Sequence, residues 1–190
     1  MQRFVALVSL LLAFTCAAQA SNVPRPSPEY VIRLTTGQQI LLSSLRGNVV
    51  ALMFISTECP HCQQTAQLMD RLYKEYGPKG FRPVAVAFNE MAMMLVPDFI
   101  KRHNISFPVG YDFRETVYAY IERSPMLRTY VPILVFIDRG GTIRAQYLGD
   151  DNFFRDQEKN IRTMIEQLLR EPAGKRTPAA NSGAAKRERS

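Results

Sequence analysis

The stretch NVVALMFISTECPHC, residues 48–62, decides the fold that this sequence predicts. Residues 48–56 are a nearly continuous apolar run of strand length, and such continuity predicts a central strand covered on both faces of a sheet. After the cysteines, apolar residues recur at helical spacing until Gly77 and Pro78, a pair that ends helices. The two cysteines therefore lie where a buried strand passes into a helix.

This position suits a disulfide-exchanging pair. Cys59 falls at the start of the helix, where unpaired N–H groups and the helix dipole favour a negative charge, and thiol pKa values at such sites are lowered. Pro60 is tolerated because the first turn needs no N–H from it, and a protonated His61 adds positive charge. Cys62 lies one turn along, where it can close on Cys59 and resolve a mixed disulfide. We expect a redox-active Cys59–Cys62 pair.

Two alternatives to redox chemistry are a structural disulfide and half of a zinc site. Zinc requires four ligands, whereas the chain without its first twenty residues offers two cysteines with His61 and His103. A haem c attachment site requires a histidine directly after Cys62, and Gln63 stands there. We therefore expect no metal and no cofactor.

Outside this stretch, strand-like and helix-like patterns alternate, which predicts an α/β sandwich with a largely parallel centre. A hairpin turn at Thr36 and Gly37 joins the first two predicted strands, and Pro97 is placed in the first turn of a helix. Strands are expected at 30–34, 39–42, 81–88, 107–111 (a short edge strand), 133–137 and 142–147, and helices at 97–103, 114–122 and 157–169.

A second chemical element precedes the strand at 133–137. Pro132 cannot donate a ladder hydrogen bond, and a proline in such a place is often cis in a tight turn. The backbone of Val131 would then be free to pair with an extended substrate peptide. The alternative is a trans proline at the start of a strand.

Taken together, residues 30–169 resemble the thioredoxin-like periplasmic thiol oxidoreductases of the TlpA/ResA type, which are grouped with the redoxins. The matching pieces are LRGNVV at 45–50, CPHC at 59–62, VAV at 84–86 followed by Glu90, FPV at 107–109, Asp112, and Val131-Pro132 with FIDRGG at 136–141. The resemblance implies a thioredoxin fold, with a central mixed sheet flanked by helices and an N-terminal β-hairpin. It also implies that Cys59 attacks, that Cys62 resolves and that Pro132 is cis.

The resemblance places Glu90 where that family keeps an acidic residue near the cysteines. A buried carboxylate there can move a proton, and the alternative is a solvated loop charge. The sequence departs from the family at Glu58, where tryptophan is usual, and in a segment between Tyr120 and Pro132 that is several residues longer.

The direction of electron flow stays open, because the Pro-His pair resembles the oxidase DsbA whereas TlpA/ResA relatives act as reductants. A peroxiredoxin-like thiol peroxidase is one competing function, although Leu52 stands where the peroxidase pattern has proline. A copper or haem-maturation chaperone is another, because thioethers such as those of Met91, Met93 and Met94 suit Cu(I). Adaptable packing or peptide contact is the simpler role for these methionines.

The ends of the chain predict export. Residues 1–20 resemble a cleaved signal peptide, with Arg3 before an apolar run and a small-x-small site at 18–20, so that Cys16 leaves with it. Residues 21–29 form an extended lead-in, residues 30–171 the thioredoxin-like domain, and residues 172–190 a disordered basic tail. We expect a soluble periplasmic protein with no membrane anchor after cleavage. Its partners would be protein thiols and disulfides and a membrane or periplasmic redox partner; the net charge of +7, concentrated in the tail, does not indicate nucleic acid.

Overall fold

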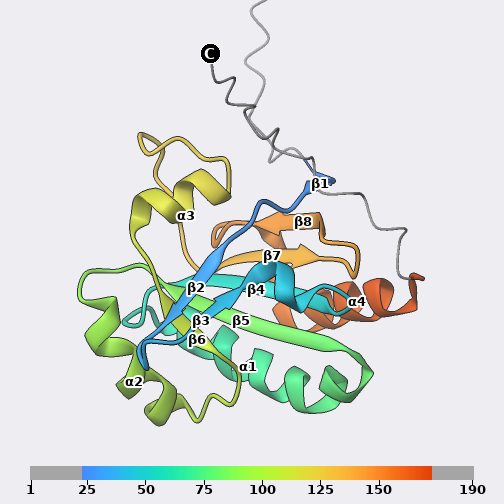
Figure 1. Ribbon diagram of the computed structural model, residues 1–190, viewed down its shortest axis with the longest axis horizontal. Coiled ribbons are helices and arrows are strands. Elements are labelled where there is room, and N and C mark those ends of the chain that lie inside the picture. The colour runs from blue at the N-terminus through green and yellow to red at the C-terminus, as the bar shows by residue number, and fades with distance from the viewer. Residues whose placement is uncertain (1–22, 173–190) are drawn as a thin grey trace, which may run out of the picture.

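The computed structural model describes residues 23–172, in which one eight-stranded mixed sheet is flanked by four α-helices (Figure 1). The strands lie in the order β1-β8-β7-β4-β5-β6-β2-β3. The strands are β1 Arg25–Pro26, β2 Val31–Leu34, β3 Gln39–Leu41, β4 Val49–Ile55, β5 Phe81–Ala87, β6 Val109–Tyr111, β7 Ile133–Ile137 and β8 Thr142–Tyr147. The helices are α1 Pro60–Tyr76, α2 Ala92–His103, α3 Arg114–Tyr120 and α4 Gln157–Arg170, with short 3-10 turns η1 Leu42–Leu45, η2 Gly77–Lys79 and η3 Asn152–Asp156.

This is the predicted thioredoxin-like α/β fold with its N-terminal hairpin, β2–β3. The predicted parallel centre is only partly present, because β4 pairs parallel with β5 but antiparallel with β7. The predicted signal peptide and nearly all of the predicted tail lie outside the described residues. No helix within residues 23–172 has the length and apolarity needed to cross a bilayer.

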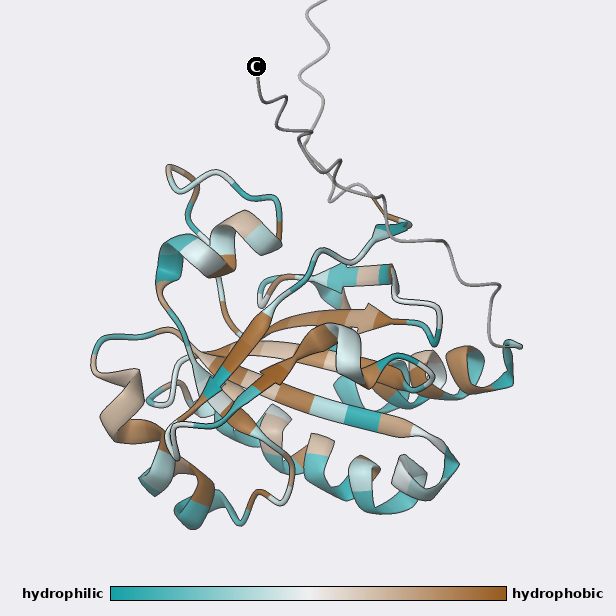
Figure 2. Cartoon of the chain, viewed as in Figure 1, coloured by the Kyte–Doolittle hydropathy of each residue, from teal (hydrophilic) through white to brown (hydrophobic). Residues whose placement is uncertain are grey.

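Strand β4 leads into the segment that contains the cysteines, and its position is fixed from both faces. All seven of its residues are buried. Val49, Ala51, Met53 and Ile55 point into a core with α1, α2 and α4, while the alternate residues point into a second core that includes α3. Figure 2 shows the resulting apolar centre of the sheet in brown. The prediction of a strand covered on both faces is confirmed, and the end of β4 has little freedom to move.

Helix α2 begins five residues earlier than predicted. The prediction placed Pro97 in the first turn, but the helix starts at Ala92 and contains Pro97. Ala92, Val96 and Phe99 are buried at helical spacing, and their burial outweighs the loss of one backbone hydrogen bond. Pro97 and Met93, the residue whose carbonyl loses its helical partner, are both exposed.

The prediction that residues 107–111 form an edge strand was wrong. Strand β6 lies between β5 and β2, because the N-terminal hairpin adds to the sheet beyond it. The pairing requires Gly110, since a Cβ there would lie 2.6 Å from the carbonyl oxygen of Arg33 on β2. At the other edge, part of the predicted lead-in forms β1, which pairs with β8.

Candidate active site

Cys59 caps the N-terminus of α1. Its Sγ accepts the backbone N–H of Cys62 at 3.3 Å, and its carbonyl accepts the N–H of Gln63 at 3.0 Å. Because Cys59 is the N-cap residue, its sulfur lies at the positive end of the helix dipole. This arrangement places the Cys59 sulfur next to the unpaired backbone N–H groups of the first helical turn.

Cys62 differs from Cys59 in its access to solvent. Both cysteines are free thiols, but Cys62 is fully buried, whereas Cys59 is partly exposed. Burial, together with the hydrogen bond to Cys59, raises the pKa of the Cys62 thiol well above its usual range. Only one sulfur of the pair is therefore presented to a partner molecule.

The loop before β7 lies directly against Cys59. The Val131–Pro132 peptide bond is cis, as expected from the sequence. The Cys59 thiol points at the carbonyl oxygen of Val131, with 3.9 Å between sulfur and oxygen. Pro132 is buried and Val131 half-buried, so Val131 is the more exposed of the two beside Cys59.

Comparison with known proteins places the chain in a family. Residues 23–146 match the model of the AhpC/TSA family. The chain belongs to the AhpC/TSA family.

Curated relatives of this AhpC/TSA-family chain include thiol-disulfide oxidoreductases named ResA. One such protein from Bacillus cereus is 25% identical over 142 residues, which cover 75% of this chain and 79% of the relative. The protein from Bacillus subtilis (strain 168) is 32% identical over 105 residues, which cover 55% and 58%. Among solved structures, a putative thiol:disulfide interchange protein DsbE from Chlorobium tepidum matches with a TM-score of 0.63 and 24% identity. That match covers 77% of this chain and 99% of the DsbE chain, and it supports the fold.

Two further residues of the family member's CPHC segment lie at the rim of the site. Pro60 is the exposed first residue of α1. The His61 ring packs edge-on against Phe154, with 5.1 Å between the ring centroids. The backbone carbonyl of His61 accepts a hydrogen bond from the hydroxyl of the buried Thr65 at 2.9 Å. These contacts hold the turn that carries both sulfurs.

Glu90 does not provide the buried carboxylate that a proton-moving role requires, because it is exposed in this AhpC/TSA-family chain. The residue before it, Asn89, reaches toward the site instead. Its side-chain oxygen accepts the N–H of Thr57, and its amide donates to the Thr57 hydroxyl, both at 3.0 Å. Asn89 thus ties the loop after β5 to the loop between β4 and α1. Sequence reasoning missed this contact, although polar residues directly after two neighbouring parallel strands are a usable signal.

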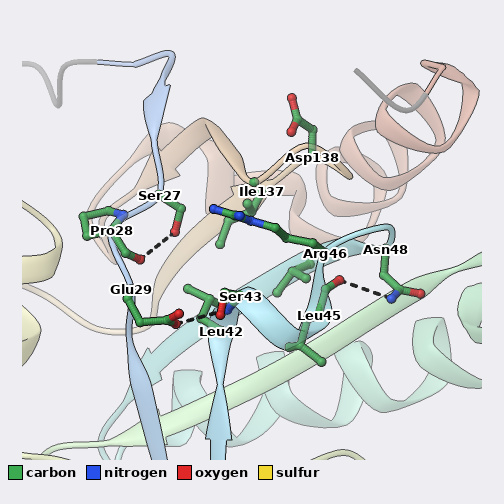
Figure 3. Close-up of a pocket in the computed structure, with 12 residues that line it drawn as sticks. Ser27, Pro28, Glu29, Leu42, Ser43, Leu45, Arg46, Asn48, Ile137 and Asp138 are labelled. Atoms are coloured by element: carbon green, nitrogen blue, oxygen red, sulfur yellow. Dashed lines mark hydrogen bonds between the residues drawn. The ribbon is translucent and has the colours of Figure 1, made fainter. Parts of the chain in front are cut away.

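One pocket of this family member lies away from the cysteines. Figure 3 shows it beside η1, with Arg46 crossing toward Ile137 and Ser27. Its lining includes Asn48 and Val50, at the start of β4, whereas Cys59 follows the other end of that strand. Neither cysteine lines this pocket, and the partly exposed Cys59 is the sulfur that is reached from the surface.

Proposed function

We propose that this protein is an exported thiol–disulfide oxidoreductase that exchanges disulfides with protein substrates through Cys59 and Cys62. The observation that carries the proposal is the asymmetry of the pair. Cys59 is accessible at a helix N-terminus and meets the Val131 carbonyl, whereas Cys62 is buried behind it. The names of the ResA relatives, and membership of a redox family, support the same chemistry.

The exchange proceeds in two displacements. The Cys59 thiolate attacks one sulfur of a substrate disulfide, and the other sulfur leaves with the electron pair and takes up a proton. Cys62 then loses its proton and displaces the substrate from Cys59, which leaves a Cys59–Cys62 disulfide and a fully reduced substrate. The reverse sequence oxidises a substrate dithiol. Cys59 attacks first because it is the accessible sulfur, and burial also raises the pKa of Cys62 above its usual range.

Roles for the surrounding residues complete the proposal. The backbone of Val131 pairs with the extended substrate segment next to its cysteine, and Pro132 holds that backbone against the sulfur. Pro60 and His61 shape the turn between the sulfurs. The signal-like residues 1–20 direct the chain to the periplasm, where a membrane or periplasmic redox partner resets the pair.

Disulfide turnover with matched cysteine variants tests the function. The purified protein is expected to reduce insulin in the presence of a dithiol, and Cys59→Ser is expected to abolish this activity. Cys62→Ser is expected to accumulate a mixed disulfide with substrate, visible as an added mass that a reductant removes. A redox titration then assigns direction, since values of about −270 mV mark a reductant and values of about −120 mV an oxidant.

Two results would contradict the proposal. One is the absence of exchange with any disulfide although Cys59 and Cys62 are free and the protein is folded. The other is consumption of peroxide that depends on Cys59 in place of disulfide turnover, which would make the protein a thiol peroxidase.

A further inference from the structure

An open groove lies beside the Cys59 sulfur, on the side of the Val131 loop. We call it the Val131 groove. One side of the groove is formed by residues at the carboxyl ends of β4 and β5, and the other by α3 and the segment between α3 and β7. These elements lie together at one end of the sheet in Figure 1. Its lining includes Ile55, Phe88, Tyr118, Val131, Arg114 and Arg128. Val131 lines the groove and its carbonyl also contacts the Cys59 sulfur. A substrate peptide disulfide-bonded to Cys59 therefore enters the groove within a residue or two.

The groove is positively charged. Arg114 comes from α3 and Arg128 from the loop before β7, and no carboxylate lines the groove. Within residues 23–172 neither arginine forms an ion pair, whereas Arg25, Arg33, Arg71, Arg102, Arg144 and Arg162 all do. Each of the two guanidinium groups instead lies over a tyrosine ring, Arg114 at 4.8 Å from the Tyr118 centroid and Arg128 at 5.0 Å from that of Tyr130. The rings restrain the two cations and leave their charge uncompensated.

Exposed apolar side chains gather in the same segments. Eight large apolar residues in the described part of the chain are exposed, and seven of them lie at 91–94 or 113–130. Met91 follows the groove residue Asn89 by two positions, Phe113 precedes Arg114, and Leu127 precedes Arg128. Met126, next in the chain to Leu127, is 91% exposed. Exposed apolar residues in the segments that line the groove favour a surface for protein contact there.

We propose that the Val131 groove selects substrates in which the reacting cysteine is followed or preceded, within about three residues, by an apolar side chain and a carboxylate. The apolar side chain lies against the half-buried Phe88, and the carboxylate lies between Arg114 and Arg128. This inference rests on the proposed function, since the peptide is held while its sulfur is joined to Cys59. Acidic peptide segments, rather than basic ones, are the substrate class that the groove fits.

Competition between charged peptides tests the proposal. Three peptides of equal length carry one cysteine, activated as the 2-thiopyridyl disulfide, with phenylalanine beside it and either aspartate, lysine or serine two and three residues away. The Cys59 thiolate displaces pyridine-2-thione, whose absorbance reports the rate. The wild-type protein is expected to react about tenfold faster with the acidic than with the basic peptide at low salt, and the preference is expected to shrink as salt is added.

Matched variants locate the preference. The double variant Arg114→Glu/Arg128→Glu is expected to invert the ratio of acidic to basic rates, and Arg114→Lys/Arg128→Lys to keep most of it. Arg46→Glu reverses a single arginine at the other end of β4 and is expected to leave the ratio unchanged. Should the charge-reversed protein fail to fold, Arg114→Gln/Arg128→Gln is expected to bring the ratio close to one.

Equal rates for the acidic and basic peptides in the wild type would overturn the inference, as would a ratio that the double reversal leaves intact. A groove occupied by a second copy of the chain would give a dimer at assay concentration and no charge preference, which also overturns it. Failure of the proposed function looks different, because then not even the serine peptide would release pyridine-2-thione through Cys59.

Discussion

At the scale of single residues, the buried thiol of Cys62 gives a pH-dependent contribution to stability. Its pKa is raised in the folded protein, whereas a cysteine in an unfolded chain titrates at about 8.5. The folded state therefore keeps a proton that the unfolded state loses. The contribution is complete below about pH 8.5 and is lost as pH rises toward the folded pKa, by at most about 1.4 kcal/mol per pH unit.

Urea unfolding of Cys59→Ser and Cys59→Ser/Cys62→Ala at several pH values between about 7 and 10 measures this contribution. The first variant keeps only the buried thiol, and the second removes it. The stability advantage of the first variant is expected to be constant near neutrality and to shrink above about pH 8.5. Tyr30 and Tyr120, whose pKa values burial also raises, are common to both proteins and cancel. An advantage that stays constant across the whole range would show that Cys62 ionises as readily in the fold as outside it.

The sequence was sufficient to place the sulfurs but not their neighbours. Cys59 and Cys62 follow from a short local pattern, because strand end, N-cap and first turn are adjacent in the chain. Asn89 and Thr57 are 32 positions apart, and which of the two polar residues after β5 turns inward depends on the path of the loop. Glu90 was chosen by resemblance, but Asn89 is the one that makes the contact.

At the scale of elements, Asp70 joins α1 to the segment between α2 and β6. Its carboxylate accepts hydrogen bonds from the N–H and hydroxyl of Ser106 at 2.7 and 2.6 Å, and it pairs with Lys74 one turn along the helix. Burial raises the pKa of Asp70, but the hydrogen bonds from Lys74 and Ser106 outweigh burial and hold it below the usual range. The charged form is therefore favoured in the folded protein.

Asp70→Asn is expected to cost about 1–3 kcal/mol at pH 7, because the buried acceptor loses its charge. The cost is full above the ordinary aspartate pKa of about 3.9 and shrinks as pH falls below it, when the wild-type carboxylate is protonated. Urea denaturation of both proteins across this range measures the difference. Asp98→Asn is the matched control, since Asp98 pairs with Arg102 at the same spacing on an exposed surface and is expected to cost less than about 1 kcal/mol. Equal costs for the two variants would remove the special role of Asp70.

Elements with long, consistent patterns were predictable, and those whose limits depend on distant contacts were not. Strand β4 and helix α1 each carry a continuous pattern with a clear stop. The start of α2 was misplaced because proline preference is a local signal, whereas burial of Ala92 depends on where the helix docks. Strand β6 has only three residues, too few to reveal that the N-terminal hairpin pairs beyond it.

At the scale of the whole molecule, Arg25 connects the edge strand β1 to the C-terminal end of α3. It is 8% exposed, and its guanidinium donates to the Tyr120 carbonyl at 3.1 Å and to the Gln146 side chain at 3.0 Å. It also pairs with Glu122 at 3.2 Å. The negative end of the helix dipole adds to this attraction. A two-residue strand could not be recognised from the sequence, because this anchor comes from residues far along the chain.

Arg25→Met is expected to lower the free energy of unfolding by about 3 kcal/mol, because a buried carbonyl and an amide lose their partner. The midpoint of urea unfolding measures the loss. Arg46→Met, at an exposed arginine, is expected to change stability by less than about 0.5 kcal/mol. If both variants unfold at the wild-type midpoint, β1 contributes nothing to the domain.

Because β4 is buried on both faces, the position of the Cys59 sulfur and the surface that surrounds it can change independently. Its rigid end sets where the reactive atom sits, while the surface around that atom includes the loop segments 89–91 and 122–130, which contribute no residue to the two buried cores around β4. Those loops can be exchanged between homologues as a cassette. A chimera made in this way should have the substrate preference of the loop donor and the reduction potential of the recipient. Substrate recognition and reduction potential can then evolve independently of each other.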